Sequence, residues 1–189
     1  QIIDHIDDLN RRVAVLDEMV KGYMAEYEAA IAAIDEISGI ARRSAEVILA
    51  EIGTDMSRFP SAAHLCSWAG VCPGNHQSAG KRKQGKTTKG SKTLKSILTQ
   101  CAKSAKTSKS SYFSAQYQRI SARRGKNRAT IAVAHSMLIA IYHVLKNNVP
   151  FHDLGSNYYD TFNREHKIKS YLKRLQALGW QPDAGGLSA

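Results

Sequence analysis

The sequence predicts an all-α protein, in which a long coiled-coil helix precedes a compact helical domain. Two patterns predict this fold: a heptad repeat over the first 34 residues, and helical apolar periodicity through most of the remainder. A third observation concerns function. No Asp or Glu occurs between Met56 and His152, whereas this stretch carries seventeen Lys and Arg. Such a surface favours a polyanionic partner, because binding to nucleic acid releases condensed counterions.

The first 34 residues are the predicted coiled-coil connector. A helix of this length would reach about 50 Å, too far to bury its apolar stripe against one compact domain. We therefore expect a partner helix and a homo-oligomer, and the alternative is a helix lying across its own domain. Because the chain begins at Gln1 inside the pattern, we also expect it to be part of a longer protein. The apolar seam, with spacings of four and three, is Ile2, Ile6, Leu9, Val13, Leu16, Val20, Tyr23, Tyr27, Ala30 and Ile34.

Residues 35–189 are the predicted helical domain, which opens with a helix-hairpin-helix over about residues 34–53. Gly39 permits a tight turn, and a new helix should run from about Arg42 to Ile52, with Gly53 as its stop. Such hairpins hold a DNA phosphate on the backbone N–H groups of the turn and the following helix, so Gly39 is a candidate nucleic-acid contact. For a motif this short, the alternative is a tight turn between packed helices.

A glycine-rich basic segment over residues 71–91 follows a short helix, Ala62 to Ala69, which Ser61 should cap and Gly70 should end. Its composition predicts a loop or irregular hairpin held against phosphate. Ser78 lies at its centre, although composition alone gives catalysis little support, because such loops are often merely solvated. The candidate nucleic-acid-binding residues of this segment are Lys81, Arg82, Lys83, Lys86 and Lys89.

Four further helices are predicted. The first, about Lys92 to Lys106, has a basic face that would continue the groove, and the second runs from about Tyr112 to Ala122. The third, about Asn127 to Leu145, should be a buried core helix, because its uncharged apolar stretch, Ile131 to Leu145, is too short to span a membrane. An amphipathic helix, Arg164 to Leu178, comes last. The candidate nucleic-acid contacts here are Lys92, Lys95, Lys103, Arg123, Arg124 and Lys126.

The cysteines predict a cytoplasmic protein without a metal site of its own. Their number is odd and their spacing matches no disulfide framework, which favours a reducing compartment, and the N-terminus has no apolar signal region. Four residues that could bind zinc lie close together in the sequence: His64, Cys66, Cys72 and His76. Structural zinc sites favour ligand pairs two to four residues apart, and this spacing does not fit them. Small packed side chains are the expected role of the cysteines.

The order of several short motifs resembles a known family. The resemblance covers about residues 31–160, and the set is specific as an ordered series although each piece is weak. The series resembles the C-terminal domain of the DEDD insertion-sequence transposases of the insertion sequence 110 family. The Piv-type invertases share this domain. The motifs are Ile37-Ser-Gly-Ile-Ala, Ala50-Glu-Ile-Gly53, Arg58-Phe59-Pro60, Ala69-Gly-Val-Cys-Pro73, Ser78-Ala-Gly-Lys81, Lys89-Gly-Ser-Lys-Thr-Leu-Lys95 and Gly125-Lys126.

This resemblance implies a division of labour between domains. Members join an N-terminal RuvC-like nuclease domain, which bears an acidic tetrad, to this helical domain through a long helical connector. A Ser in the basic loop acts as the nucleophile on DNA and forms a phosphoserine linkage, and Ser78 is the matching position. Members also use a structured guide RNA to choose their DNA sites, so the resemblance implies RNA as a second partner beside DNA.

The chemistry of the residues agrees with that division. Attack of a hydroxyl on a phosphodiester normally uses Mg²⁺ held by carboxylates, and the stretch around Ser78 has none. Mg²⁺ should therefore come through another domain, and this fragment alone should be inactive. The predicted function is the DNA-binding, nucleophile-bearing half of a transposase. The alternative is a non-catalytic helix-hairpin-helix module that only binds nucleic acid, whereas a coiled-coil assembly protein would leave the acid-free stretch unexplained.

Overall fold

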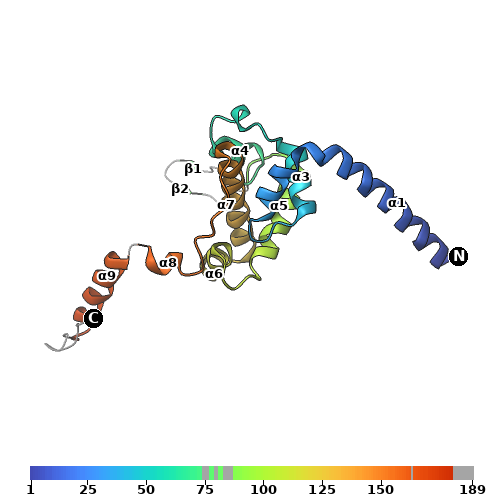
Figure 1. Cartoon of the computed structure of the whole chain (residues 1–189). Coiled ribbons are helices and arrows are strands. Elements are labelled where there is room, and N and C mark those ends of the chain that lie inside the picture. Colours follow the sequence, from blue (N-terminus) through green and yellow to red (C-terminus); the bar gives the residue numbers. More distant parts are fainter. Residues whose placement is uncertain (74–76, 79–80, 83–86, 163, 181–189) are drawn as a thin grey trace.

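Figure 1 shows the computed structural model of the chain, which describes residues 1–73, 77–78, 81–82, 87–162 and 164–180, with only the backbone of residues 77–78 and 81–82. The all-α prediction is confirmed, with one very small hairpin added. The elements in chain order are α1 (Ile2–Met24), a 3-10 turn (Ala25–Tyr27), α2 (Glu28–Asp35), α3 (Arg42–Ile52), a 3-10 turn (Met56–Arg58), α4 (Ala62–Trp68), β1 (Gln77–Ser78), β2 (Lys81–Arg82), α5 (Lys92–Ala105), α6 (Tyr112–Arg124), α7 (Lys126–Asn147), α8 (Tyr158–Thr161) and α9 (Arg164–Ala177).

Helix α7 forms the centre of the body, in contact with α2, α4, α5 and α6 (Figure 1). Its fully buried side chains include Val133, Met137, Leu138 and Ile141. Among the described helices, α7 alone is long and apolar enough to cross a membrane, and half of its apolar window is buried inside the protein. The expectation that its apolar stretch is too short to span a membrane is therefore wrong, whereas the expected role as a buried core helix is confirmed.

The N-terminal helix is shorter than the heptad pattern predicts. Instead of one helix from Ile2 to Ile34, α1 ends at Met24, and the 3-10 turn leads into α2, which begins at Glu28. The two helices have different surroundings: Ile31 and Ile34 of α2 are buried in the core, whereas α1 buries no residue and extends away from the body (Figure 1). The alternative of a helix lying across its own domain is therefore wrong for α1.

The segment after α7 returns to α6 and is fastened there by Asp153. Its carboxylate accepts hydrogen bonds from the Tyr112 N–H at 2.8 Å and from the Ser38 hydroxyl at 3.0 Å, which joins the α2–α3 turn to the start of α6. The Tyr112 ring stacks on Tyr159 with centroids 5.3 Å apart, so Tyr112 packs the returning segment onto α6. Beyond this point, α9 confirms the last predicted helix but buries no residue and lies apart from the core (Figure 1).

Candidate nucleic-acid interface

The basic segment forms an antiparallel hairpin, one of the two forms expected for it. Its base is closed by the Thr88 N–H, which donates to the Cys72 carbonyl at 3.2 Å, and by a bridge between Pro73 and Thr87. Further out, β1 pairs with β2 so that Ser78 lies opposite Lys81. Residues Lys83 and Lys86 lie outside the described residues, as do the side chains of Ser78, Lys81 and Arg82.

A close backbone crossing anchors the base of this hairpin to the body. Gly90, on the returning arm, passes so near the end of α4 that a Cβ added to it would lie 2.4 Å from the Trp68 carbonyl oxygen and 2.4 Å from the Gly70 nitrogen. Gly70 ends α4 with a φ of 72°, as the sequence predicts for a helix stop. Only glycine fits at position 90, because any side chain would collide with backbone atoms.

Ser91 and Lys95 link the hairpin arm to α5 and α3. The Ser91 hydroxyl oxygen caps α5 by accepting from the Leu94 N–H at 3.1 Å, and its proton is donated to Glu51 Oε2 at 2.8 Å. The Lys95 ammonium donates to the Thr87 hydroxyl. Lys95, a predicted nucleic-acid contact, is half-buried. Its bond to Thr87 therefore also holds the hairpin base against α5.

Six of the predicted contacts have side chains exposed to solvent in the part of the chain that the structure describes. Lys89 lies on the returning arm of the hairpin, and Lys92 and Lys103 lie on α5, whose opposite face is buried as expected. The other three are at the corner between α6 and α7, where Gly125 adopts a φ of 83°. These are Arg123, Arg124 and Lys126.

Cations and carboxylates are segregated along the chain. Among the described residues, every ion pair lies within residues 1–46, and no Lys or Arg between Arg58 and Lys146 pairs with a carboxylate. Unpaired cations repel one another and attract phosphate. Three of them lie over aromatic rings instead, at centroid distances between 5.1 and 5.7 Å: Lys106 over Tyr117, Arg119 over Tyr159 and Lys146 over Tyr142.

The turn between α2 and α3 is shaped by packing against α5. Gly39 has a φ of 93°, and a Cβ there would lie 2.6 Å from the Ala105 Cβ and 2.7 Å from the Ala105 nitrogen. The need for glycine at this position therefore follows from helix packing alone. This matches the expected alternative of a tight turn between packed helices, and a phosphate contact at Gly39 stays a prediction.

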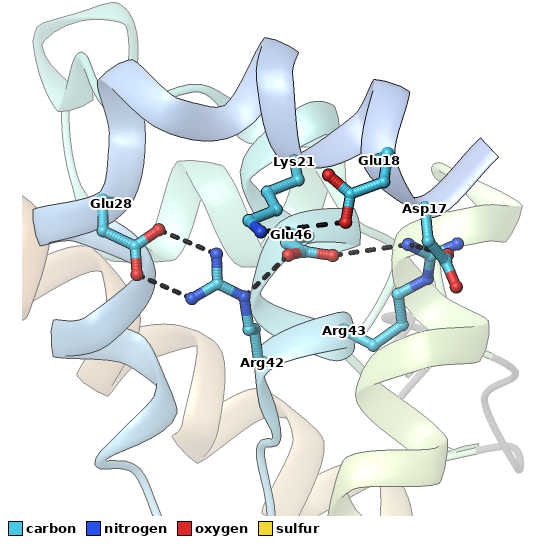
Figure 2. Close-up of polar contacts among 7 residues, drawn as sticks. All are labelled: Asp17, Glu18, Lys21, Glu28, Arg42, Arg43 and Glu46. Carbon is cyan, nitrogen blue, oxygen red and sulfur yellow. Dashed lines mark hydrogen bonds and ion pairs between the residues drawn. The ribbon is translucent and has the colours of Figure 1, made fainter. Parts of the chain in front are cut away.

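Carboxylates surround the two arginines that begin α3 (Figure 2). Arg42 donates to both oxygens of Glu28, at 2.6 and 2.7 Å, and its Nε donates to Glu46 at 3.1 Å. These hydrogen bonds lower the pKa of the Glu28 carboxyl. Arg43 pairs with Glu46 at 3.5 Å and with Asp17 of α1 at 3.3 Å. This network connects α1 and α2 to α3 and compensates the positive charge at the start of α3.

The cysteines are packed as expected. Burial in the core raises the pKa of the Cys66 thiol to about 12, and its Sγ lies 3.8 Å from the His135 carbonyl oxygen, to which it donates. Cys72 is only half-buried, and His76 lies outside the described residues. In the described chain, no three His, Cys, Asp or Glu side chains gather as metal ligands would.

Two residues near the hairpin base were missed by the sequence analysis. Glu51 lies in the last turn of α3, whose apolar pattern predicts only that Glu51 is off the core face. The bond of Glu51 to Ser91 therefore had no signal in the sequence. Trp68 is 45 % exposed on α4. The core stripe of that helix is Leu65, Cys66 and Ala69, so the position of Trp68 beside the stripe was a usable signal of exposure.

Comparison with known proteins agrees with this geometry. Residues 31–118 match the model of a transposase family described as "Transposase IS116/IS110/IS902 family". The matched stretch extends from α2 to the first half of α6 and includes the whole hairpin. This match supports a transposase role, and with it DNA as a partner. No curated protein matches the chain.

Proposed function

We propose that this chain is the DNA-binding, nucleophile-bearing part of an insertion-sequence transposase that cuts and joins DNA through a serine–phosphate linkage. The observation that carries the proposal is the position of Ser78. It ends β1 opposite Lys81, in a hairpin that lies within the transposase match and within the stretch of sequence that has no Asp or Glu. A hydroxyl in a lysine-rich segment can approach a phosphodiester that the lysines of the segment also bind.

The proposed step exchanges one phosphorus–oxygen bond for another. The Ser78 hydroxyl oxygen attacks a backbone phosphorus and loses its proton, while the bond from that phosphorus to one sugar oxygen breaks and that oxygen takes up a proton. Among the described residues, no three carboxylates lie together as Mg²⁺ ligands would, and Glu51 already accepts from Ser91. The metal-binding carboxylates would belong to another domain, and the fragment alone would be inactive.

The proposal includes assembly through α1. Apart from Val20, its seam side chains are 46 to 79 % exposed up to Tyr23, and a second copy of the same helix would cover them. A structured guide RNA as a second partner rests on the family resemblance alone. The alternative of a non-catalytic helix-hairpin-helix module has less support, because its phosphate site would adjoin Arg42 and Arg43, which are already bound to carboxylates.

The test is strand transfer by the full-length protein in the presence of Mg²⁺. Replacing Ser78 with Ala should abolish transfer while DNA affinity stays within about twofold, since the change removes one oxygen and no charge. Ser96→Ala, at an exposed position of α5, is the matched control and should transfer normally. Full activity of the Ser78→Ala protein would refute the proposal.

A further inference from the structure

We propose that Trp68 is a stacking platform for an unpaired DNA base beside the Ser78 hairpin. The inference rests on the proposed function for its ligand, DNA. It adds that the DNA strand is locally unpaired where it meets the base of the hairpin.

Trp68 is held in place yet remains open to a ligand. Its indole packs against Phe59, with ring centroids 5.8 Å apart and the planes tilted by 56°. Phe59 in turn packs on the hydrophobic core, so the indole has a fixed support. Even so, 45 % of Trp68 is exposed, although Leu65 and Cys66 on the same short helix are fully buried. An exposed indole on rigid structure can stack on a base at little entropic cost.

The arm of the hairpin passes directly over the backbone at Trp68. The Gly90 crossing brings this arm against the Trp68 carbonyl, and the Thr88 hydroxyl donates to the Ser67 carbonyl at 3.4 Å. Between Thr88 and Gly90 comes Lys89, whose side chain is exposed. Trp68 therefore lies where the hairpin leaves the body, and the arm that crosses it carries an exposed cation, Lys89.

The composition of the segments that meet at Trp68 favours nucleic acid as the occupant. No Asp or Glu occurs between Met56 and His152, so α4 and both arms of the hairpin offer only cations and neutral groups. Proteins that bind single strands combine such cationic tracks with exposed aromatic rings, on which bases of any sequence stack. A fully paired duplex cannot supply a free base face, because its bases are already stacked on each other.

The test compares two DNA duplexes of equal length, one fully paired and one with about four unpaired bases in its centre. Trp68→Ala in the full chain should weaken binding to the partly unpaired duplex about tenfold, within the range of about 1–3 kcal/mol per stacked base. Affinity for the paired duplex should change less than about twofold. The dependence of affinity on salt should not change, because no charge is removed. Trp68→Phe should retain most of the affinity, which guards against an effect of misfolding.

A matched control is provided by Trp180, the other of the two tryptophans, which is also 45 % exposed. Trp180→Ala should leave both affinities unchanged, and in Trp180→Phe the fluorescence of Trp68 should be quenched by the partly unpaired duplex alone. Equal affinities of Trp68→Ala and the unaltered protein for the unpaired DNA would overturn the inference and leave the proposed function standing. Failure of the unaltered chain to bind either duplex would overturn both.

Discussion

The Ser91 hydroxyl donates a hydrogen bond to the Glu51 carboxylate across 2.8 Å, while its oxygen accepts from the Leu94 N–H. One side chain thus joins the end of α3 to the start of α5, at the position where the hairpin arm enters that helix. Ser91 lies in a lysine-rich sequence and is the most serious rival of Ser78 as a nucleophile. Its contacts give it a structural role instead.

Ser91→Ala should therefore lower the stability of the fold without abolishing strand transfer. Loss of the helix cap and of the bond to Glu51 should reduce the free energy of unfolding by about 1–2 kcal/mol, measured by urea denaturation. Ser96→Ala, which removes an exposed hydroxyl from the same helix, should change it by less than about 0.5 kcal/mol. Strand transfer by the full-length Ser91→Ala protein should persist, and its complete loss in a folded variant would contradict this account.

Gly90→Ala should destabilise the hairpin base. The new Cβ would lie 2.4 Å from backbone atoms of Trp68 and Gly70, so the arm must shift, at a cost of about 1–3 kcal/mol in the free energy of unfolding. Hydrogen exchange at the Thr88 N–H, which bonds to Cys72, should become faster. Gly22→Ala is the matched control, because it has nothing within 4 Å and lies in α1, where Ala favours the helix. Unchanged exchange in Gly90→Ala would be inconsistent with the observed crossing.

The cysteines should differ in reactivity with pH. Burial raises the pKa of Cys66 from its usual 9.0 to about 12, so the reactive thiolate is scarce between pH 7 and 9, and half-buried Cys72 should be alkylated first. Because unfolding releases the Cys66 proton, the same shift makes stability fall as the pH rises from about 9 towards 12. Mass spectrometry after timed alkylation tests the order. Faster modification of Cys66 than of Cys72 would show that Cys66 is not buried as described.

Most helices could be predicted from sequence, because each has an apolar stripe and clear end signals. Helix α3 runs from Arg42 to Ile52 with Gly53 as its stop, as its pattern predicts. The core helix α7 is likewise within two residues of its predicted ends. Position Gly39 was also predicted as the turn, but its contact with Ala105 could not be, because the two residues meet only after α3 and α5 pack together.

The length of the first helix was predicted wrongly, because the heptad spacing continues past the point where the helix enters the body. The 4-3 spacing extends to Ile34, yet the helix is interrupted at Ala25–Tyr27, since Ile34 is buried in the body and Tyr23 is exposed to solvent. A heptad pattern records only which side chains share a face, and it does not distinguish a core from a partner helix. Contacts between distant residues, such as that of Glu51 with Ser91, leave no such pattern at all.

Disrupting the α1 seam should separate copies of the chain without unfolding the body. Val13→Lys combined with Leu16→Lys places two charges on the seam, and sedimentation should change from an oligomer to a monomer while the melting transition of the body is kept. The matched control is Ala14→Lys with Val15→Lys, which adds the same charge to the same helix off the seam. A monomeric unaltered chain at high concentration would contradict assembly through α1.

The exposed cations should determine how DNA affinity depends on salt. If about five of them touch phosphate, the logarithm of the affinity should fall with that of the salt concentration with a slope near −4 to −5. Lys103→Ala should reduce the magnitude of this slope by about one, whereas Arg12→Ala should not, because Arg12 pairs with Asp8 on α1. Lys95→Ala should have a smaller effect than Lys103→Ala, since its ammonium already donates to Thr87. A slope near zero would show that these cations do not contact DNA phosphates.

The identity of the nucleophile is tested most directly by capturing the covalent protein–DNA product. The full-length protein would be stopped during strand transfer with Mg²⁺, digested, and the modified peptide mapped by mass spectrometry. We predict a phosphoserine linkage at Ser78 and its absence in Ser78→Ala. A linkage at any other residue, or none under conditions of active transfer, would contradict the assignment of Ser78 as the nucleophile.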